Sequence, residues 1–316
     1  MPEADRVKRS PLLSPGRILT GSLHWADFHV PERRELRDPS SPSDHDRDPF
    51  AIDGDVPHPA RIQNYLAGGD DNFAADRDVA DRMSQALPGG IKTAQAAVRT
   101  LGAFVGRSVR FLAGEAGVRQ FLNVGVAIPS ARNVHNVAQM AAPDARVVYV
   151  GNDPVALAKS HCLQVGSDEG ATAYLHGSLR DPPLILRQAA DTLDLTLPVG
   201  VILPTTLNFV PDGDDPHGLV ARLLKGVPSG SYLVIAHAGD DLEAEGMPEA
   251  SARLSEALRE AWSPRGHAEI ARFFDGLDLV SPGLVPIDTW RPTAVAPTPS
   301  PPTRLTPIYA AVAHKP

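Results

Sequence analysis

Small and polar residues that could bind a ligand follow two apolar runs of this chain. Residues 121–126 are apolar except for Asn123 and lead into a turn, and residues 146–150 lead directly into Gly151–Asp153. Such runs are typical of buried strands, and residues 130–141 between them predict a helix. Two buried strands joined by a helix form a parallel pair. The small and polar residues then lie at the carboxyl ends of parallel strands, where α/β sheets bind nucleotide-type ligands.

The same alternation of strand and helix continues along the rest of the chain. Further strands are predicted at residues 171–176, 199–203, 231–237, 277–287 and 306–313. Helices are predicted at residues 154–165, 183–193, 216–224, 249–262 and 267–274. Seven strands, with helices between the first five, predict a doubly wound, mostly parallel α/β sheet. The last two strands are joined without a helix, so they must be antiparallel if they are neighbours.

The chain before the first strand divides into two parts. Residues 1–55 are rich in Pro, Ser, Asp and Arg. They cannot bury enough apolar surface to offset their ordering entropy, so we expect most of them to be disordered. Residues 56–118 contain two short helical patterns, the second capped by Asn72, and a longer one at residues 93–116. This segment predicts a helical N-terminal cap on the α/β core formed by residues 119–316.

The composition narrows the class of protein. The 316 residues are 42% hydrophobic and carry a net charge of −8, which favours a large buried core and argues against nucleic acid as a partner. Cys162 is the single cysteine, which fits the reducing cytoplasm and leaves no thiolate-rich metal site. His161 and His176 have no companions at ligand spacing, so no metal is expected. The sequence contains no run of about 18 apolar residues, so no membrane span is expected. Arginine far outnumbers lysine, which suggests a GC-rich bacterial genome.

Six ordered segments resemble one bacterial family of S-adenosyl methyltransferases, formerly known as a domain of unknown function. They are ARIQNYLAGGDDNFAADRDVADR, FLNVGVAIPSARNVHNVAQ, ARVVYVGNDPVAL, SLRDP, LNFVPDGDDP and FFDGLDLVSPGLVPIDTWRP. The resemblance runs from about His58 to Pro316. It implies a Rossmann-like, class I methyltransferase fold and S-adenosylmethionine as the cofactor.

The resemblance also implies where the cofactor binds. The turn after the first strand would contact the methionine part, and the end of the second strand would face the ribose hydroxyls. The loop after the third strand would approach the adenine, the loop Pro204–Phe209 would lie beside the methyl group, and the cap would form a lid. The implied cofactor-binding residues are Asn123, Gly125, Ala127, Pro129, Gly151, Asn152, Asp153, Ser178, Leu179, Arg180, Pro204, Asp71, Asn72 and Phe73.

Four of these positions depart from the usual pattern of the family. Asn123, Gly151 and Ser178 stand where the family has an acid, and Ala127 replaces a glycine. Each lost charged acceptor weakens binding by roughly 1.5–3 kcal/mol, about tenfold to a hundredfold in affinity. Asn123 keeps an acceptor oxygen, and Asp153 could replace the acid at the ribose.

Two functions follow. The first is an S-adenosylmethionine-dependent methyltransferase that acts on an unidentified small molecule. Methyl transfer needs mainly positioning, and Asn208, Tyr65 or His237 could orient the acceptor. His237 could equally be a buried polar group with its hydrogen bonds satisfied. The alternative function is a catalytically inactive homologue that serves as a binding or regulatory protein. Binding of S-adenosylmethionine by the purified protein distinguishes the two.

Overall fold

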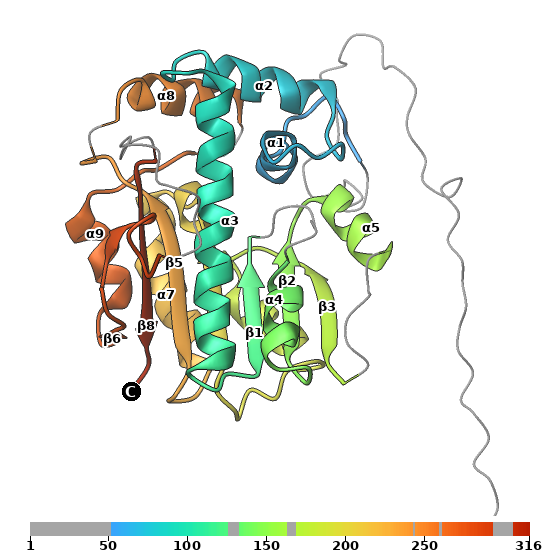
Figure 1. The fold of residues 1–316 in the computed structure, drawn as a ribbon. Helices are drawn as coiled ribbons and strands as arrows, with labels where there is room; N and C mark the ends of the chain where they lie inside the picture. The colour runs from blue at the N-terminus through green and yellow to red at the C-terminus, as the bar shows by residue number, and fades with distance from the viewer. Residues whose placement is uncertain (1–51, 126–132, 163–168, 243, 259–260, 293–305) are drawn as a thin grey trace, which may run out of the picture. The chain divides into compact units, whose positions relative to one another are not determined.

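The computed structural model describes residues 52–125, 133–162, 169–242, 244–258, 261–292 and 306–316. An eight-stranded sheet forms its centre, in the order β3-β2-β1-β4-β5-β8-β6, and β7 also pairs with β8 (Figure 1). The strands are β1 (Gln120–Val124), β2 (Arg146–Gly151), β3 (Ala171–His176), β4 (Gly200–Pro204), β5 (Tyr232–Ala238), β6 (Asp278–Leu279), β7 (Val285–Pro286) and β8 (Ile308–His314). The first five strands are parallel, and β8 runs antiparallel to β5, β6 and β7. The predicted doubly wound, mostly parallel sheet is confirmed.

Helices cover both faces of this sheet. They are α1 (Pro59–Leu66), α2 (Ala74–Ser84), α3 (Ile91–Gly114), α4 (Val134–Ala141), α5 (Pro154–Cys162), α6 (Pro182–Ala189), α7 (Pro216–Lys225), α8 (Met247–Ala257) and α9 (His267–Ala271). Three 3-10 turns, η3 (Thr206–Phe209), η4 (Asp212–Asp214) and η5 (Arg272–Phe274), complete the described elements. Phe104 and Leu112 of α3 pack on one face, and Leu219 and Leu223 of α7 pack on the other. Every residue of β1 is buried, as expected for a strand covered on both sides.

The chain reverses its winding direction between β1 and β4. Leu122 of β1 lies opposite Val148 of β2 and also opposite Val201 of β4. The connections that leave these two strands therefore diverge to opposite sides, and they open a crevice at the carboxyl ends. Ligand sites of open α/β sheets lie at this kind of point.

The cap lies over the carboxyl ends of the parallel strands. Figure 1 shows α1, α2 and α8 above the strand ends, with α3 running from the cap down one face of the sheet. Ile62 of α1, Val79 of α2 and Leu254 of α8 belong to one buried apolar cluster. Arg253 of α8 donates to the backbone oxygen of Arg82 in α2 at 2.7 Å. A helix from the second half of the chain therefore completes the cap.

Two local predictions were wrong. Residues 277–287 form two short strands because the turn at residues 281–283 interrupts them: Pro282 has no N–H to donate, and Gly283 has a φ of 91°. Asn72 does not cap α2. The N-cap is Phe73, whose N–H donates to the carboxylate of Asp76 at 2.8 Å, while Asn72 donates to Asn64.

Several predictions fall outside the described residues. The expected disordered segment falls almost entirely on residues 1–51, and the Pro-rich loop between the last two strands falls on residues 293–305. Ala127 and Pro129 also lie outside. No helix in the described ranges is long and apolar enough to cross a membrane.

Candidate functional site

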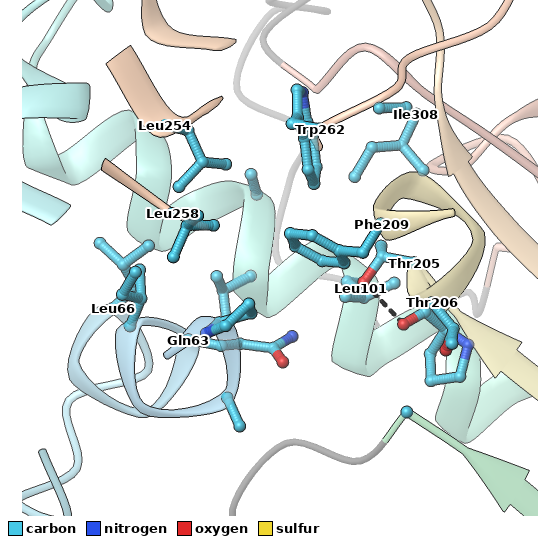
Figure 2. A pocket seen from close by; sticks show the side chains of 18 of the residues that line it. Gln63, Leu66, Leu101, Thr205, Thr206, Phe209, Leu254, Leu258, Trp262 and Ile308 are labelled. Atoms are coloured by element: carbon cyan, nitrogen blue, oxygen red, sulfur yellow. Dashed lines mark hydrogen bonds between the residues drawn. The ribbon is translucent and has the colours of Figure 1, made fainter. Parts of the chain in front are cut away.

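A cavity of about 260 Å³ lies between the cap and the carboxyl ends of β1 to β4 (Figure 2). Its sheet side is formed by small residues: Gly125 follows β1, Gly151 ends β2, Gly177 follows β3 and Pro204 ends β4. Parallel strands end at the same edge of a sheet, so four separate segments converge here. A ligand can therefore approach the backbone of all four strand ends.

Position 125 requires a glycine, both for its backbone conformation and for the space beside it. Its φ of 86° lies in the left-handed region, which only glycine adopts easily. A Cβ at this position would lie 2.0 Å from Oγ1 of Thr206, and that hydroxyl donates to the backbone oxygen of Val124. Thr205 also has a positive φ, of 63°. The ends of β1 and β4 are thus held together by a strained turn and a hydroxyl that fits against a glycine.

Faces of α1, α3 and α8, together with Met83 of α2, form the cap side of the cavity. In α8 the lining residues follow a spacing of i, i+3, i+4 and i+7, which places them on one side of the helix. The helical residues that line it include Ile62, Gln63 and Leu66 of α1, Thr93, Ala94, Ala97, Val98 and Leu101 of α3, and Met247, Ala250, Ser251 and Leu254 of α8. This wall is mainly apolar.

Two aromatic side chains complete this side of the cavity. The rings of Phe209 and Trp262 meet at a centroid distance of 5.2 Å and an angle of 64°. Nε1 of Trp262 donates to Oγ of Ser251 at 3.1 Å, which fixes the orientation of the indole ring. We call the part of the cavity bounded by α1, α3, α8, Phe209 and Trp262 the chamber.

Charge is scarce around the cavity. Among the described residues that line it, only His58 and Arg180 carry ionisable side chains. Nε of Arg180 pairs with the carboxylate of Asp214 at 2.9 Å, and its Nη2 donates to the backbone oxygen of Phe209 at 3.0 Å. The guanidinium is thus already occupied. No carboxylate lines the cavity in the described part of the chain.

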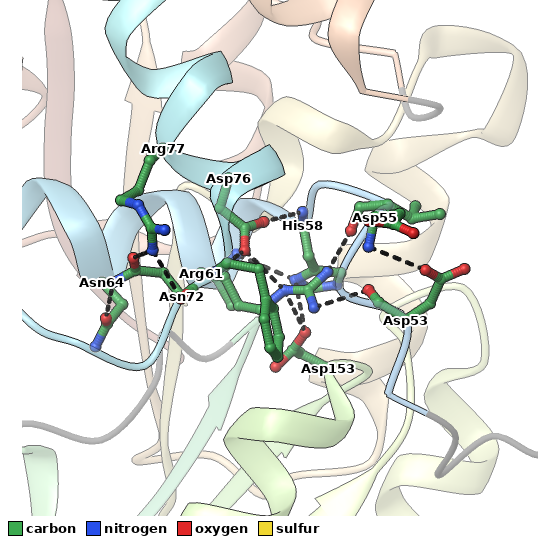
Figure 3. Close-up of polar contacts among 12 residues, drawn as sticks. Asp53, Asp55, His58, Arg61, Asn64, Asn72, Asp76, Arg77 and Asp153 are labelled. Carbon is green, nitrogen blue, oxygen red and sulfur yellow. Dashed lines mark hydrogen bonds and ion pairs between the residues drawn. The ribbon is translucent and has the colours of Figure 1, made fainter. Parts of the chain in front are cut away.

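Buried charges gather instead beside the cavity, where α1 meets the start of α5 (Figure 3). Nε of Arg61 lies 3.4 Å from Oδ2 of both Asp76 and Asp153, and Nδ1 of His58 lies 3.4 Å from the same oxygen of Asp153. Arg61, Asp76 and Asp153 are at most 4% exposed. The backbone N–H groups of His58 and Phe73 donate to Asp76 at 2.8 Å. We call these side chains the Arg61 cluster.

Seven of the sequence-predicted cofactor residues come together around the cavity. They are Gly125, Gly151, Asn152, Ser178, Leu179, Arg180 and Pro204. They belong to four different strand ends, and the prediction that these segments meet agrees with this arrangement. Their contact with a cofactor stays a prediction.

Asp153 does not line the cavity. Its side chain is buried in the Arg61 cluster, and its Oδ1 accepts the backbone N–H of Ala156 in the first turn of α5 at 2.9 Å. These partners hold its carboxylate outside the cavity wall, and its contact with a ribose stays a prediction. Asn123 is also buried outside the cavity, and its Oδ1 has no hydrogen-bond partner in the described structure.

The predicted lid residues join α1, α2 and α5 to one another. Asp71 pairs with Lys159, Asn72 bonds Asn64 and Arg77, and the ring of Phe73 lies 5.1 Å below the guanidinium of Arg61. None of Asp71, Asn72 and Phe73 lines the cavity.

The three candidate orienting residues also lie outside the cavity wall. The hydroxyl of Tyr65 lies 3.3 Å from Asp81. Oδ1 of Asn208 accepts the backbone N–H of Ala238 at 3.1 Å. These contacts join neighbouring segments of the protein.

His237 has both ring nitrogens engaged. Its Nδ1 lies 2.9 Å from the backbone oxygen of Ala238 and its Nε2 lies 2.9 Å from Nη1 of Arg265, an arrangement that fits a neutral ring with the proton on Nδ1. Burial, together with the smaller effect of the adjacent Arg265, lowers the pKa of His237 to about 4. Of the two roles that the sequence allowed for His237, these contacts agree with a buried polar group whose hydrogen bonds are satisfied.

Sequence reasoning missed most of the chamber. Gln63, Trp262 and the inner face of α8 carry no catalytic motif, whereas Phe209 ends the loop that the resemblance placed beside the methyl group. The 3–4 spacing of α8 indicates an amphipathic helix, but nothing in that pattern shows which surface it covers. Because α8 lies more than 120 residues beyond the first strand, only the tertiary structure brings it to the cavity.

The geometry suits positioning of ligands rather than proton transfer. The strand ends offer backbone groups and small residues, and the chamber offers apolar contact and exclusion of water. A reaction that needs a strong general base has only His58 on this wall, among the described residues.

Comparisons with known proteins match the part of the chain that forms the cap and the sheet. A family model described as S-adenosyl methyltransferase matches residues 45–316. A DUF574 family protein from Streptomyces avermitilis is 38% identical, with 83% of this chain and 99% of that chain covered and a TM-score of 0.79. A putative methyltransferase from Thermobifida fusca is 32% identical, with 83% and 96% covered and a TM-score of 0.75. A comparison with curated proteins gave no match. The similarity thus extends over the cap and the sheet together.

Proposed function

This chain belongs to the S-adenosyl methyltransferase family, and we propose that it transfers a methyl group from its cofactor to a small molecule bound in the cavity. S-adenosylmethionine is the cofactor that this membership implies. The observation that carries the proposal is a single cavity that joins four parallel strand ends to an apolar chamber. Cofactor and acceptor can then meet where the strand ends face the chamber.

The residues at the strand ends fit the cofactor in shape. Gly125, Gly151 and Gly177 leave the backbone accessible, and the side chain of Asn152 stands at the rim with an amide oxygen that can accept from a ribose hydroxyl. The main departure is at Gly151, where a carboxylate would accept from two hydroxyls. We therefore expect S-adenosylmethionine to bind, but more weakly than a site with that carboxylate would bind it.

The chemical step asks little of this protein beyond geometry. The bound cofactor supplies a methyl group on a sulfonium, which already contains a good leaving group. The cap helices exclude water, and the turn at Thr205 and Thr206 fixes the end of β4 beside the end of β1. Orientation of two reactants in a dry cavity is the contribution that such enzymes make.

One observation favours a second candidate, a catalytically inactive homologue with a binding or regulatory role. Within the described wall no carboxylate faces the cavity, and the nearby carboxylate of Asp153 is held by Arg61 and His58. A cofactor site that has lost its charged acceptors loses affinity at each one.

Isothermal titration of the purified protein with S-adenosylmethionine and S-adenosylhomocysteine separates the two candidates. A dissociation constant of about 100 μM or tighter, roughly −5.5 kcal/mol, supports the enzyme. Absence of heat up to about millimolar ligand, together with an unchanged melting temperature, would rule it out and leave the binding role.

A further inference from the structure

We propose that the methyl acceptor is an uncharged, largely aromatic small molecule that packs in the chamber and is oriented by a hydrogen bond to the side-chain amide of Gln63. This inference rests on the proposed function, because the molecule in the chamber is an acceptor only if the strand ends hold the cofactor. Its three parts, which are the lack of charge, the aromatic character and the hydrogen bond, have separate support in the structure.

The lack of charge follows from the chamber wall. Leu66, Leu101, Leu254 and Leu258 contribute apolar surface from three sides. The two ionisable side chains of the whole described lining have other contacts, since Arg180 pairs with Asp214 and His58 lies beside Asp153. A charged acceptor would lose its hydration and find no counter-charge among the described residues of the chamber wall. The chamber therefore selects against carboxylates and ammonium groups.

The aromatic character follows from the Phe209–Trp262 pair. The two rings meet edge to face, and the bond from Trp262 to Ser251 prevents the indole from turning to fill the chamber itself. Aromatic rings prefer edge-on or offset contacts with one another. A third ring can add to this pair from the open side of the chamber, and a flexible aliphatic chain gains no such contact.

Gln63 supplies the polar contact. Figure 2 shows its side chain directed from α1 into the space that Phe209 and Trp262 also face. In the described structure the Gln63 amide forms no hydrogen bond, although it carries two donor hydrogens and an acceptor oxygen. When an apolar ligand displaces water from the chamber, this amide must bond to the ligand or remain unpaired at a cost. An acceptor with one hydroxyl or carbonyl group satisfies it.

The position of Gln63 is fixed by its neighbours on α1. Arg61, two residues earlier, is held by Asp76 and Asp153, and Ile62 packs in the apolar cluster of the cap. The helix therefore cannot easily rotate to take the amide out of the chamber. A fixed hydrogen-bonding group in an apolar wall gives orientation, which methyl transfer requires.

The test uses the full-length protein, an aromatic dye and three smaller aromatic competitors built on the same naphthalene ring. N-phenyl-1-naphthylamine, an uncharged dye that fluoresces in apolar surroundings, reports occupancy, and naphthalene, 1-naphthol and 1-naphthoate compete with it. We expect 1-naphthol to bind about tenfold more tightly than naphthalene, and 1-naphthoate to compete at least tenfold more weakly than 1-naphthol. Equal competition by 1-naphthoate and 1-naphthol would overturn the proposal.

Two variants locate the binding. Gln63→Leu should reduce the ratio of 1-naphthol to naphthalene affinity by about fivefold to tenfold and leave naphthalene bound, because only the hydrogen bond is lost. Leu254→Arg should abolish dye binding, whereas Ala252→Arg, on the exposed side of the same helix, should not. If Leu254→Arg fails to fold, Gln63→Leu decides alone, and an unchanged ratio contradicts the proposal.

Titration of the same preparations with S-adenosylhomocysteine separates this inference from the proposed function. A wild-type protein that binds S-adenosylhomocysteine but none of the uncharged probes would contradict the chamber and leave methyl transfer standing. A protein that binds the probes with the expected order but not the cofactor would contradict methyl transfer.

Discussion

The cap contacts the sheet at two neighbouring places of opposite character. At the Arg61 cluster, α1 is joined to the start of α5 by buried charges with ion pairs of 3.4 Å. At the chamber, mostly apolar residues of α1, α3 and α8 and the uncharged amide of Gln63 face a cavity beside the strand ends. Charge therefore holds the cap in place on one side, and apolar surface is left for ligands on the other.

This difference separates polar residues that bind other parts of the protein from the surface that is left open to a ligand. Asp71, Asn72 and Asp153 have the residue types that bind cofactors, but in the structure they bind the protein itself. A buried charge is costly unless it is paired, so a chain that buries several must supply their partners. The surface left for a ligand consists mainly of small and apolar residues, which carry no recognisable motif in the sequence.

The largest expected effect comes from removal of the charge at the centre of the Arg61 cluster. Arg61→Met leaves the buried carboxylates of Asp76 and Asp153 without their shared cation. We expect a loss of about 3–5 kcal/mol in the free energy of unfolding, measured by urea denaturation. Loss of the cap position should also weaken cofactor binding.

The matched control is Arg82→Met on α2. Arg82 pairs with Asp78 at 2.8 Å, but its side chain is 57% exposed, and such pairs contribute only about 0.5 kcal/mol. An Arg61→Met protein as stable as Arg82→Met would show that the cluster is not what joins the cap to the sheet.

A second effect concerns His237, a buried polar group near the end of β5. Like the side chains of the Arg61 cluster, it binds other parts of the protein and does not line the cavity. Burial lowers its pKa in the folded protein to about 4, against about 6.5 in an unfolded chain. Between these values the unfolded chain binds a proton that the folded protein does not. Stability is therefore fully present above pH 6.5 and falls by about 3 kcal/mol as the pH drops to 4.

Urea denaturation at several pH values checks this slope. His135 and His217 contribute in the same direction, since burial also lowers their pKa values. His237→Asn should reduce the slope between pH 6.5 and 4, whereas His267→Asn at an exposed position should leave most of it. An equal slope in both variants would mean that His237 is accessible to protons in the folded protein.

Periodicity predicted the sheet well because it depends on local burial. The runs at residues 121–126, 146–150 and 231–237 are apolar since both faces of a parallel sheet are covered, and the structure places β1, β2 and β5 there. The long strand at residues 277–287 was wrong because a local turn with Gly283 and Pro282 overrides its apolar pattern.

The candidate site was harder to predict because it depends on which face of an element meets which neighbour. Gly151 and Ser178 stand at the cavity, as a position at a strand end suggests. Asp153, only two residues from Gly151, turns away because the first turn of α5 and Arg61 bind its carboxylate. Such competition between partners is a tertiary property, and no spacing in the sequence reveals it.

The smallest expected effect comes from adding negative charge to the cavity wall at the strand ends. Gly151→Asp combined with Ser178→Asp places two carboxylates at strand ends that line the cavity. Gly151 ends β2 in strand geometry, so the backbone accepts an aspartate without the strain of a left-handed residue. If S-adenosylmethionine binds as proposed, with ribose and adenine near these positions, the double variant should bind it about tenfold or more tightly by isothermal titration.

A control is needed because S-adenosylmethionine is positively charged and any added carboxylate attracts it. Ala103→Asp combined with Ala252→Asp adds the same charge at exposed positions of α3 and α8 that do not line the cavity. This pair should change the affinity little, since exposed charges beyond about 8–10 Å are largely screened at physiological salt. Binding of N-phenyl-1-naphthylamine should stay the same in both double variants, because the chamber wall is unaltered. If the strand-end pair and the control pair bind the cofactor equally, the cofactor does not lie on the strand ends. The uncharged cavity beside the Arg61 cluster would then bind a different ligand.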